Sequence, residues 1–180
     1  TRRSSDLNES VHDFRLLEPT IKRYKKFGLS FEAHLMVNDP VSCLPGVNQA
    51  GFDRVIAHVE CRDPRDFLSE ARAYDMEVGL AVDAETPVEQ IEPFLEEIDC
   101  VLIMTADAGF SGQPFDEDTV EKIKIIHRAL PDLPIGVDCG MNDQTAKVVR
   151  DAGATRIGST SYLFKDESKI DEAIDSLIGE

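Results

Sequence analysis

Short apolar runs alternate along the chain with longer amphipathic segments. Six runs rich in β-branched residues predict strands. Their centres recur 20 to 34 residues apart, which is typical of repeated strand–helix units. Several runs are apolar throughout, as in a parallel sheet covered on both faces. The pattern predicts an α/β fold, and it is shared by doubly wound sheets and barrels. The predicted strands are Phe31–Val37, Arg54–Val59, Val78–Val82, Val101–Thr105, Ile135–Asp138 and Thr155–Gly158.

The segments between these runs carry helix signals. An apolar stripe at three- and four-residue spacing runs from Val120 to Leu130. Thr86 and Glu89 form a capping-box pair around Pro87, which predicts a helix beginning there. A helix is also expected at Glu18–Phe27, and one at Pro40–Ala50 would be interrupted by Pro45-Gly46. Further helix starts and ends are expected at Pro64, Asn142, Gly51 and Gly153.

The length indicates one domain of 180 residues. Residues 1–13 are polar, lack either periodicity and are expected to form a loop, whereas residues 14–180 carry the strand–helix units. A complete barrel of eight such units usually needs about 250 residues. Six units in this chain therefore fit only part of such a barrel.

Charge and cysteine content narrow the function classes. The formal net charge of −16 argues against nucleic acid and anionic membranes as partners, although backbone amides can still hold a small anion. No apolar run approaches the roughly 20 residues needed to span a bilayer. The four cysteines contain no C-x-x-C pair, which is typical of reduced thiols. A cytoplasmic protein is expected.

Two polar residues lie at the ends of predicted strands. His34 alternates with Glu32 and Met36, so these three side chains should point to one side. Taken alone, His34 is more simply a buried histidine bonded to a carbonyl, and His58 has the same ambiguity. Asp138 ends an apolar strand, where burial is costly unless the carboxylate is paired or metal-bound. Asn142 is better placed to cap the next helix, so a functional Asp138 is favoured.

Two loops could bind an anion. Gly109 and Gly112 flank Phe110-Ser111 and free the backbone to turn its N–H groups toward a phosphate, or simply to form a turn. Gly158–Ser161 offers small residues and hydroxyls at the start of an expected short helix. An ordinary helix cap would look the same there.

Read in order, six segments resemble the ribulose-phosphate 3-epimerase family. The block G-F-x-G-Q-x-F after V-L-I-M-T is the most specific of them, and the resemblance extends from about His34 to Phe164. It implies a (β/α)₈ TIM barrel. The segments are His34–Val37, His58–Glu60, Gly79–Pro87, Val101–Phe115, Val137–Gly140 and Ser159–Phe164.

The resemblance also implies roles for individual residues. His34 would bind a divalent metal (zinc, iron(II), manganese or cobalt) and lie at the substrate. Asp138 would be both a metal ligand and a catalytic acid–base. Met36 and Met104 would lie against the enediolate. The substrate's phosphate would be held by Gly109, Phe110, Ser111, Gly112, Cys139, Gly140, Thr160 and Ser161.

The chain departs from the family pattern in three ways. The family's first two strands carry a serine and an H-x-D-x-M-D-G segment, which supplies a metal histidine and the second catalytic aspartate. That segment should fall at or before Thr1, so the first two strands are expected to be missing. The adjacent pair His12-Asp13 would splay across a strand and is no substitute. In addition, Cys139 replaces a glycine and Ala108 a proline.

The resemblance implies a ketose-phosphate 3-epimerase that converts ribulose 5-phosphate to xylulose 5-phosphate and forms a homo-oligomer. One alternative is an allulose-6-phosphate 3-epimerase, which the Thr160-Ser161 ending also resembles. Another is a non-catalytic sugar-phosphate-binding relative. A keto-sugar-phosphate decarboxylase is disfavoured because Val78–Val82 and Val101–Thr105 contain no lysine.

Overall fold

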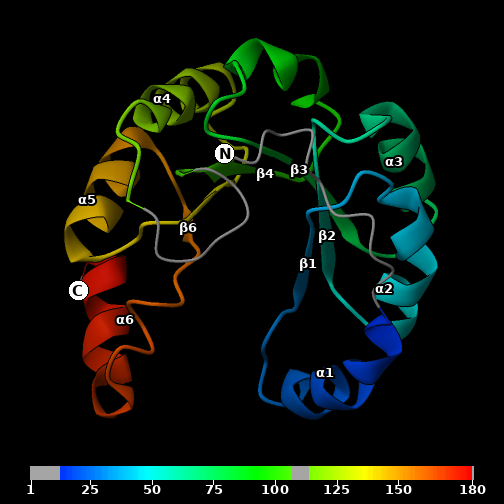
Figure 1. The fold of residues 1–180 in the computed structure, drawn as a ribbon, viewed down its shortest axis with the longest axis horizontal. Coiled ribbons are helices and arrows are strands. Elements are labelled where there is room, and N and C mark those ends of the chain that lie inside the picture. Colours follow the sequence, from blue (N-terminus) through cyan, green and yellow to red (C-terminus); the bar gives the residue numbers. More distant parts are fainter. Residues whose placement is uncertain (1–12, 107–113, 180) are drawn as a thin grey trace.

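The chain folds around one parallel sheet of six strands. A computed structural model describes residues 13–106 and 114–179 (Figure 1). The strands pair in sequence order, so each one neighbours the next along the chain. The predicted α/β fold is therefore confirmed. The strands are β1 (Glu32–Leu35), β2 (Arg54–His58), β3 (Glu77–Val82), β4 (Cys100–Met104), β5 (Ile135–Asp138) and β6 (Arg156–Ile157).

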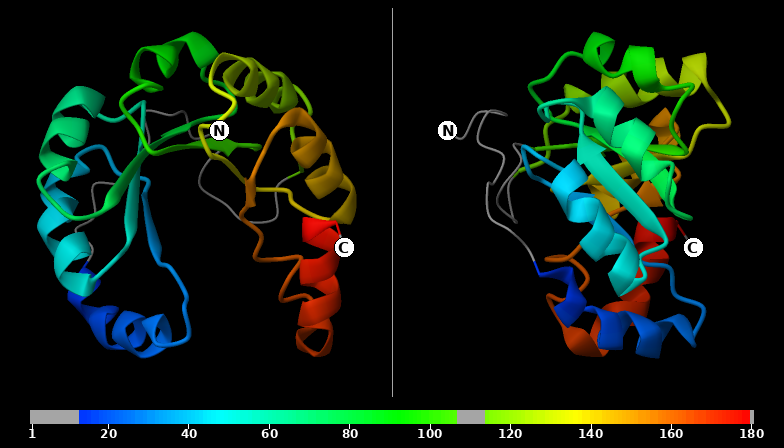
Figure 2. Two further views of the ribbon diagram at one scale, coloured as in Figure 1. Left: turned by 180° about the vertical axis from the view of Figure 1, so that it is seen from behind. Right: turned by 90° about the vertical axis from the view of Figure 1, so that its right-hand side faces the viewer.

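The sheet curves into an arc, and the helices lie along its convex side (Figures 1 and 2). The arrangement is a half-barrel whose concave side faces inward. The α-helices are α1 (Glu18–Lys25), α2 (Leu44–Ala50), α3 (Pro64–Ala71), α4 (Thr119–Ala129), α5 (Asp143–Ala152) and α6 (Ile170–Ile178). Short 3₁₀ turns occur at Phe14–Leu16, Val41–Cys43, Val88–Gln90, Glu92–Phe94 and Glu167–Lys169.

Most helix signals are confirmed. Asn142 caps α5 through a capping box with Thr145. Gly51 and Gly153 end α2 and α5 in the left-handed conformation, which favours glycine. Pro45 does not break α2, because it lies in the first turn, where no backbone donor is needed.

Two helix predictions are wrong. The capping-box pair Thr86 and Glu89 is followed by two 3₁₀ turns instead of an α-helix. Pro93 gives a physical reason, because it has no N–H to donate one turn back to Glu89. Gly158–Ser161 does not begin a helix either: the segment forms a turn closed by the Phe164 N–H on the Thr160 carbonyl.

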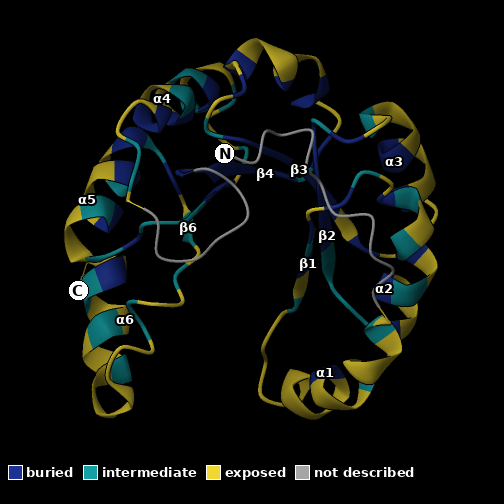
Figure 3. Ribbon diagram, viewed as in Figure 1, coloured by how far each residue is buried: buried dark blue, intermediate teal, exposed yellow. Residues whose placement is uncertain are grey.

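Side-chain alternation divides the sheet into two faces. One face packs against the helices and forms the main apolar core, shown as the buried inner surface of the helices in Figure 3. The concave face carries a smaller cluster of apolar side chains. Its members are Ile56, Ala81, Cys100, Leu102 and Met104, with Cys139 packed against them. The concave face therefore carries far fewer buried apolar side chains than the face that packs against the helices.

Charged side chains occupy the amino end of the concave face. Arg54 on β2 donates to Glu32 at 3.0 Å and also to Glu77 on β3. Arg156 on β6 donates to the same Glu32 carboxylate at 3.3 Å. β1 and β6 are the first and last strands in the sheet order, so this contact crosses the concave side. We call Glu32, Arg54, Glu77 and Arg156 the floor network.

Glu32→Gln should destabilise the fold, because it leaves Arg156 without its carboxylate inside the arc. These side chains are only partly exposed, so we expect a loss of about 1–2 kcal/mol in the free energy of unfolding, measured by urea titration. Glu18→Gln is the matched control. Its partner Lys22 is on the exposed face of α1, and the loss should stay below about 0.5 kcal/mol. A loss for Glu32→Gln no larger than that for the control would show that the floor network adds no more stability than an exposed helix pair.

Candidate active site

Polar side chains gather at the carboxyl end of the strands, on the concave face. Because all the strands are parallel, their carboxyl ends lie at the same end of the sheet. Met104 and Asp138 are register partners on β4 and β5, so their side chains share a face. Met104 belongs to the concave cluster, which places Asp138 on the concave face as well. His34 lies on β1, at the other side of the arc.

The alternation expected for β1 is confirmed. Ala33 and Leu35 are buried in the main core, whereas Glu32 and His34 point to the concave side. His34 is in register with Ile56 on β2. The next residue of β2 on the same face is His58, two positions further along. The Nε2 atoms of the two histidines are 2.8 Å apart, and their rings stack with centroids 4.9 Å apart.

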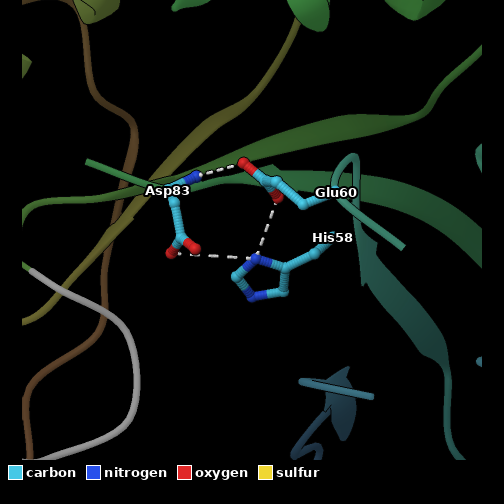
Figure 4. A group of neighbouring side chains, drawn as sticks. All are labelled: His58, Glu60 and Asp83. Atoms are coloured by element: carbon cyan, nitrogen blue, oxygen red, sulfur yellow. Dashed lines mark hydrogen bonds and ion pairs between the residues drawn. The ribbon is translucent and has the colours of Figure 1, made fainter. Parts of the chain in front are cut away.

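His58 also meets two carboxylates (Figure 4). Its Nδ1 lies 3.2 Å from Glu60 Oε2 and 3.8 Å from Asp83 Oδ1. The Asp83 N–H donates to the second oxygen of Glu60 at 3.0 Å. His58 is fully buried and Asp83 is only 6% exposed. Their ligand atoms lie within 4.8 Å of one another, so these three residues could hold a cation.

Lys122 on α4 fixes the chain that follows β3. Its Nζ donates to the backbone carbonyls of Asp83, Ala84 and Thr86 at 2.6–2.7 Å. Burial lowers the pKa of Lys122, while the charges of Glu60, Asp116 and Asp83 oppose that shift. A positive charge therefore lies beside the buried carboxylates.

The protonation states suit a ligand role for His34. Burial lowers the pKa of His34 to about 3, and any positive charge on His58 would act in the same direction. His34 is therefore neutral at physiological pH and keeps a lone pair, as a metal ligand must. Burial would raise the pKa of Glu60. Hydrogen bonds from His58, Thr86 and the Asp83 amide outweigh it, and the pKa is lowered.

Asp138 is held by its neighbours. Its Oδ1 accepts the Cys139 N–H at 2.8 Å, and its carbonyl accepts the N–H and hydroxyl of Thr105 at 2.8 and 2.7 Å. A Cβ on Gly158 would lie 3.0 Å from Asp138 Oδ1, so glycine leaves this carboxylate room. The half-buried carboxylate is thus carried on a fixed backbone.

Cys139 is unusual in its backbone. It has a φ of +84°, in the left-handed region that favours glycine. Burial and the nearby charges of Asp138 and Asp83 raise the pKa of its thiol to about 11, so the thiol stays protonated. Gly140 follows with a φ of +65°, and a Cβ there would lie 2.9 Å from the Phe115 backbone. Gly140 is therefore needed for close packing.

The structure describes only some of the other predicted site residues. Gly109, Phe110, Ser111 and Gly112 lie outside the described residues. Met104 is buried and Met36 is 37% exposed. Thr160-Ser161 lies in the turn after β6.

His34 and Asp138 are separated in the sheet by β2, β3 and β4. No hydrogen bond or ion pair joins these two residues within the described part of the chain. Their convergence on one ion stays a prediction.

Sequence reasoning overlooked Asp83 and Lys122. Asp83 follows the apolar strand Val78–Val82 just as Asp138 ends its own strand. The cost of burying a carboxylate there would have identified it as a candidate. Lys122 gave no comparable signal, because it lies on a helix and reaches only backbone carbonyls.

Metal-free protein should lose stability as pH falls from about 7.5 to about 5. Unfolded His34 binds a proton below its ordinary pKa of 6.5, whereas folded His34 binds one only near 3. Between these two pH values only the unfolded state binds the proton, so the free energy of unfolding decreases as the pH falls. Glu60 contributes only below its ordinary pKa of 4.5. His34→Asn should reduce the drop in Tm across this range in the presence of a chelator. If the drop in Tm were the same in His34→Asn as in the wild type, a lowered pKa of His34 in the folded protein would be contradicted.

Sequence and structure comparisons locate this chain among known proteins. Among the described residues, no helix combines the length and apolarity needed to cross a membrane. The chain is similar in fold to the crystal structure of a KGPDC from Streptococcus mutans, with a TM-score of 0.73 and 14% identity. That match covers 92% of this chain and 79% of the other.

Curated relatives are closer in sequence. The chain is 34% identical to a ribulose-phosphate 3-epimerase of Chlamydia muridarum, over 78% of this chain and 64% of that protein. A ribulose-phosphate 3-epimerase of Bacillus subtilis is also 34% identical, over 78% of this chain and 69% of that protein. The chain thus spans about two thirds of the length of these relatives. The model of the ribulose-phosphate 3 epimerase family matches residues 11–164. The chain belongs to the ribulose-phosphate 3-epimerase family.

Proposed function

We propose that this chain forms the larger part of a ketose-phosphate 3-epimerase that interconverts D-ribulose 5-phosphate and D-xylulose 5-phosphate. One observation carries the proposal: Asp138 is fixed at the carboxyl end of β5, on the concave face beside Met104, in a chain of this family. A fixed carboxylate suits proton transfer at a carbon next to a carbonyl.

A divalent metal would be held by His34 and Asp138. The chemistry of their donor atoms supports this proposal, since His34 is neutral and Asp138 offers carboxylate oxygens. Mixed nitrogen and oxygen donors suit zinc, iron(II), manganese or cobalt. The ion, when bound, would stabilise negative charge on the substrate oxygens.

Asp138 would remove or return the C3 proton on one face of the sugar. Met36 and Met104 would present soft sulfur to the planar part of the substrate, without a competing proton donor. Epimerisation also needs an acid–base group on the opposite face. We propose that this group lies in a segment preceding the six strands.

Backbone amides would bind the phosphate. Loops after the last strands of such barrels commonly do so. Cys139-Gly140 and Thr160-Ser161 occupy that position in this fold. The strained backbone at Cys139 and the close packing of Gly140 support a shaped loop there. Gly109–Gly112 would complete the phosphate site.

The open edges of the sheet support a larger barrel. β1 and β6 each lack a neighbour on one side within the described residues. Two further strands between them would complete a (β/α)₈ barrel. Without these strands, the exposed edges should favour association into homo-oligomers. We also propose a cytoplasmic location, in which the four free cysteines would stay reduced.

Asp138→Asn in the full-length protein should lower kcat by about 10³-fold, because the amide cannot accept the proton. The assay is C3 epimerisation of ribulose 5-phosphate with added Mn²⁺. Asp143→Asn, an exposed change in the first turn of α5, is the control and should keep full activity. Wild-type turnover by Asp138→Asn would refute the assignment. The isolated 180-residue chain should show negligible turnover, because Asp138 is the one acid–base group that the family resemblance assigns within it.

A further inference from the structure

The contact between His34 and His58 restricts where their protons can lie. Two imidazole nitrogens 2.8 Å apart must form a hydrogen bond, in which one donates its N–H and the other accepts. The two Nε2 atoms therefore share a single proton. Which ring carries that proton depends on what the other nitrogens do.

The other nitrogen of His58 is constrained by its neighbours. Nδ1 faces oxygens of Glu60 and Asp83, at 3.2 and 3.8 Å, and ionised carboxylates can only accept hydrogen bonds. His58 Nδ1 therefore carries a proton. In a neutral His58 ring, Nε2 is then a bare lone pair, which accepts the N–H of His34 Nε2. His34 is left with its own lone pair on Nδ1.

We infer that Glu60 and His58 are positioning residues that hold His34 in the tautomer with a proton on Nε2, so that His34 binds the metal through Nδ1. This inference rests on the proposed function for the metal itself. A metal-binding histidine commonly donates its second N–H to an acceptor, which fixes the ring and raises its basicity. Here His58 is that acceptor and transmits the charge of Glu60.

Glu60 is well placed for this role. Its Oε1 accepts the Asp83 N–H, which leaves Oε2 facing His58. The carboxylate side chain is only 6% exposed, and hydrogen bonds lower its pKa, so it stays ionised next to the ring. Buried hydrogen bonds of this kind are stronger than those in water.

The same cluster could instead be a cation site of its own. Two observations favour the positioning role. His58 Nδ1 is already engaged with Glu60, and a cation would have to displace that proton. The charge of Lys122 also acts on Glu60 and Asp83, and it offsets part of their negative charge without an ion. The cluster therefore needs a cation less than two unpaired carboxylates would.

The first test reads the tautomer directly. In the metal-free full-length protein, ¹⁵N-histidine NMR should show His34 protonated on Nε2 and bare on Nδ1. Glu60→Gln should shift the population toward the other tautomer, whereas Glu85→Gln, an exposed change after β3, should not. His34 protonated on Nδ1 in the wild type would overturn the inference. This readout needs neither metal nor turnover, so it decides the inference even where the epimerase proposal fails.

The second test reads metal binding. Co²⁺ titration, followed by absorbance, should give a Kd about 10- to 100-fold weaker for Glu60→Gln and for His58→Asn than for wild type and Glu85→Gln. Thermal melts check that each variant is folded. If His58→Asn does not fold, the Kd of Glu60→Gln alone tests the inference. An unchanged Kd in folded Glu60→Gln would overturn the inference. So would a second Co²⁺ equivalent that binds wild type and is lost in Glu60→Gln.

Discussion

The parallel register of the six strands is the constraint on which the rest of the structure depends. Side chains alternate along each strand, so every strand gives one set to the helices and the other to the concave face. The register then decides which concave side chains become neighbours. His34 meets His58, and Met104 lies beside Asp138, because β1 with β2 and β4 with β5 pair at these positions. If one strand slipped by one residue in this register, its concave side chains would turn toward the apolar core.

This constraint explains what the sequence could and could not predict. Periodicity located all six strands and most helix ends, because these depend on local residues. The helix predicted after Thr86 was wrong because Pro93 outweighs a good start signal. The contact between His34 and His58 depends on register, which no local pattern contains. Asp83 could have been predicted from the cost of burying a carboxylate at a strand end, as Asp138 was. The proximity of Lys122 to Asp83 and Glu60 could not, because it depends on how α4 packs against the end of β3.

Charge is distributed unevenly in this acidic chain. The net charge is −16, yet the floor network pairs two arginines with two glutamates. Around His58, Lys122 offsets the buried carboxylates. Asp138, on the same face, has no lysine or arginine bound to its side chain among the described hydrogen bonds and ion pairs. A carboxylate in this setting is open to an incoming metal or substrate.

The link between Glu32 and Arg156 has a consequence for how the chain folds. Neighbouring strands in this sheet are also neighbours in sequence, so each strand–helix unit can dock on the previous one through short-range contacts. Glu32 and Arg156 are 124 residues apart and cannot meet until every intervening unit is in place. We therefore expect their hydrogen bond to form last in folding and to break first in unfolding. Its presence would report that the arc has reached its native curvature.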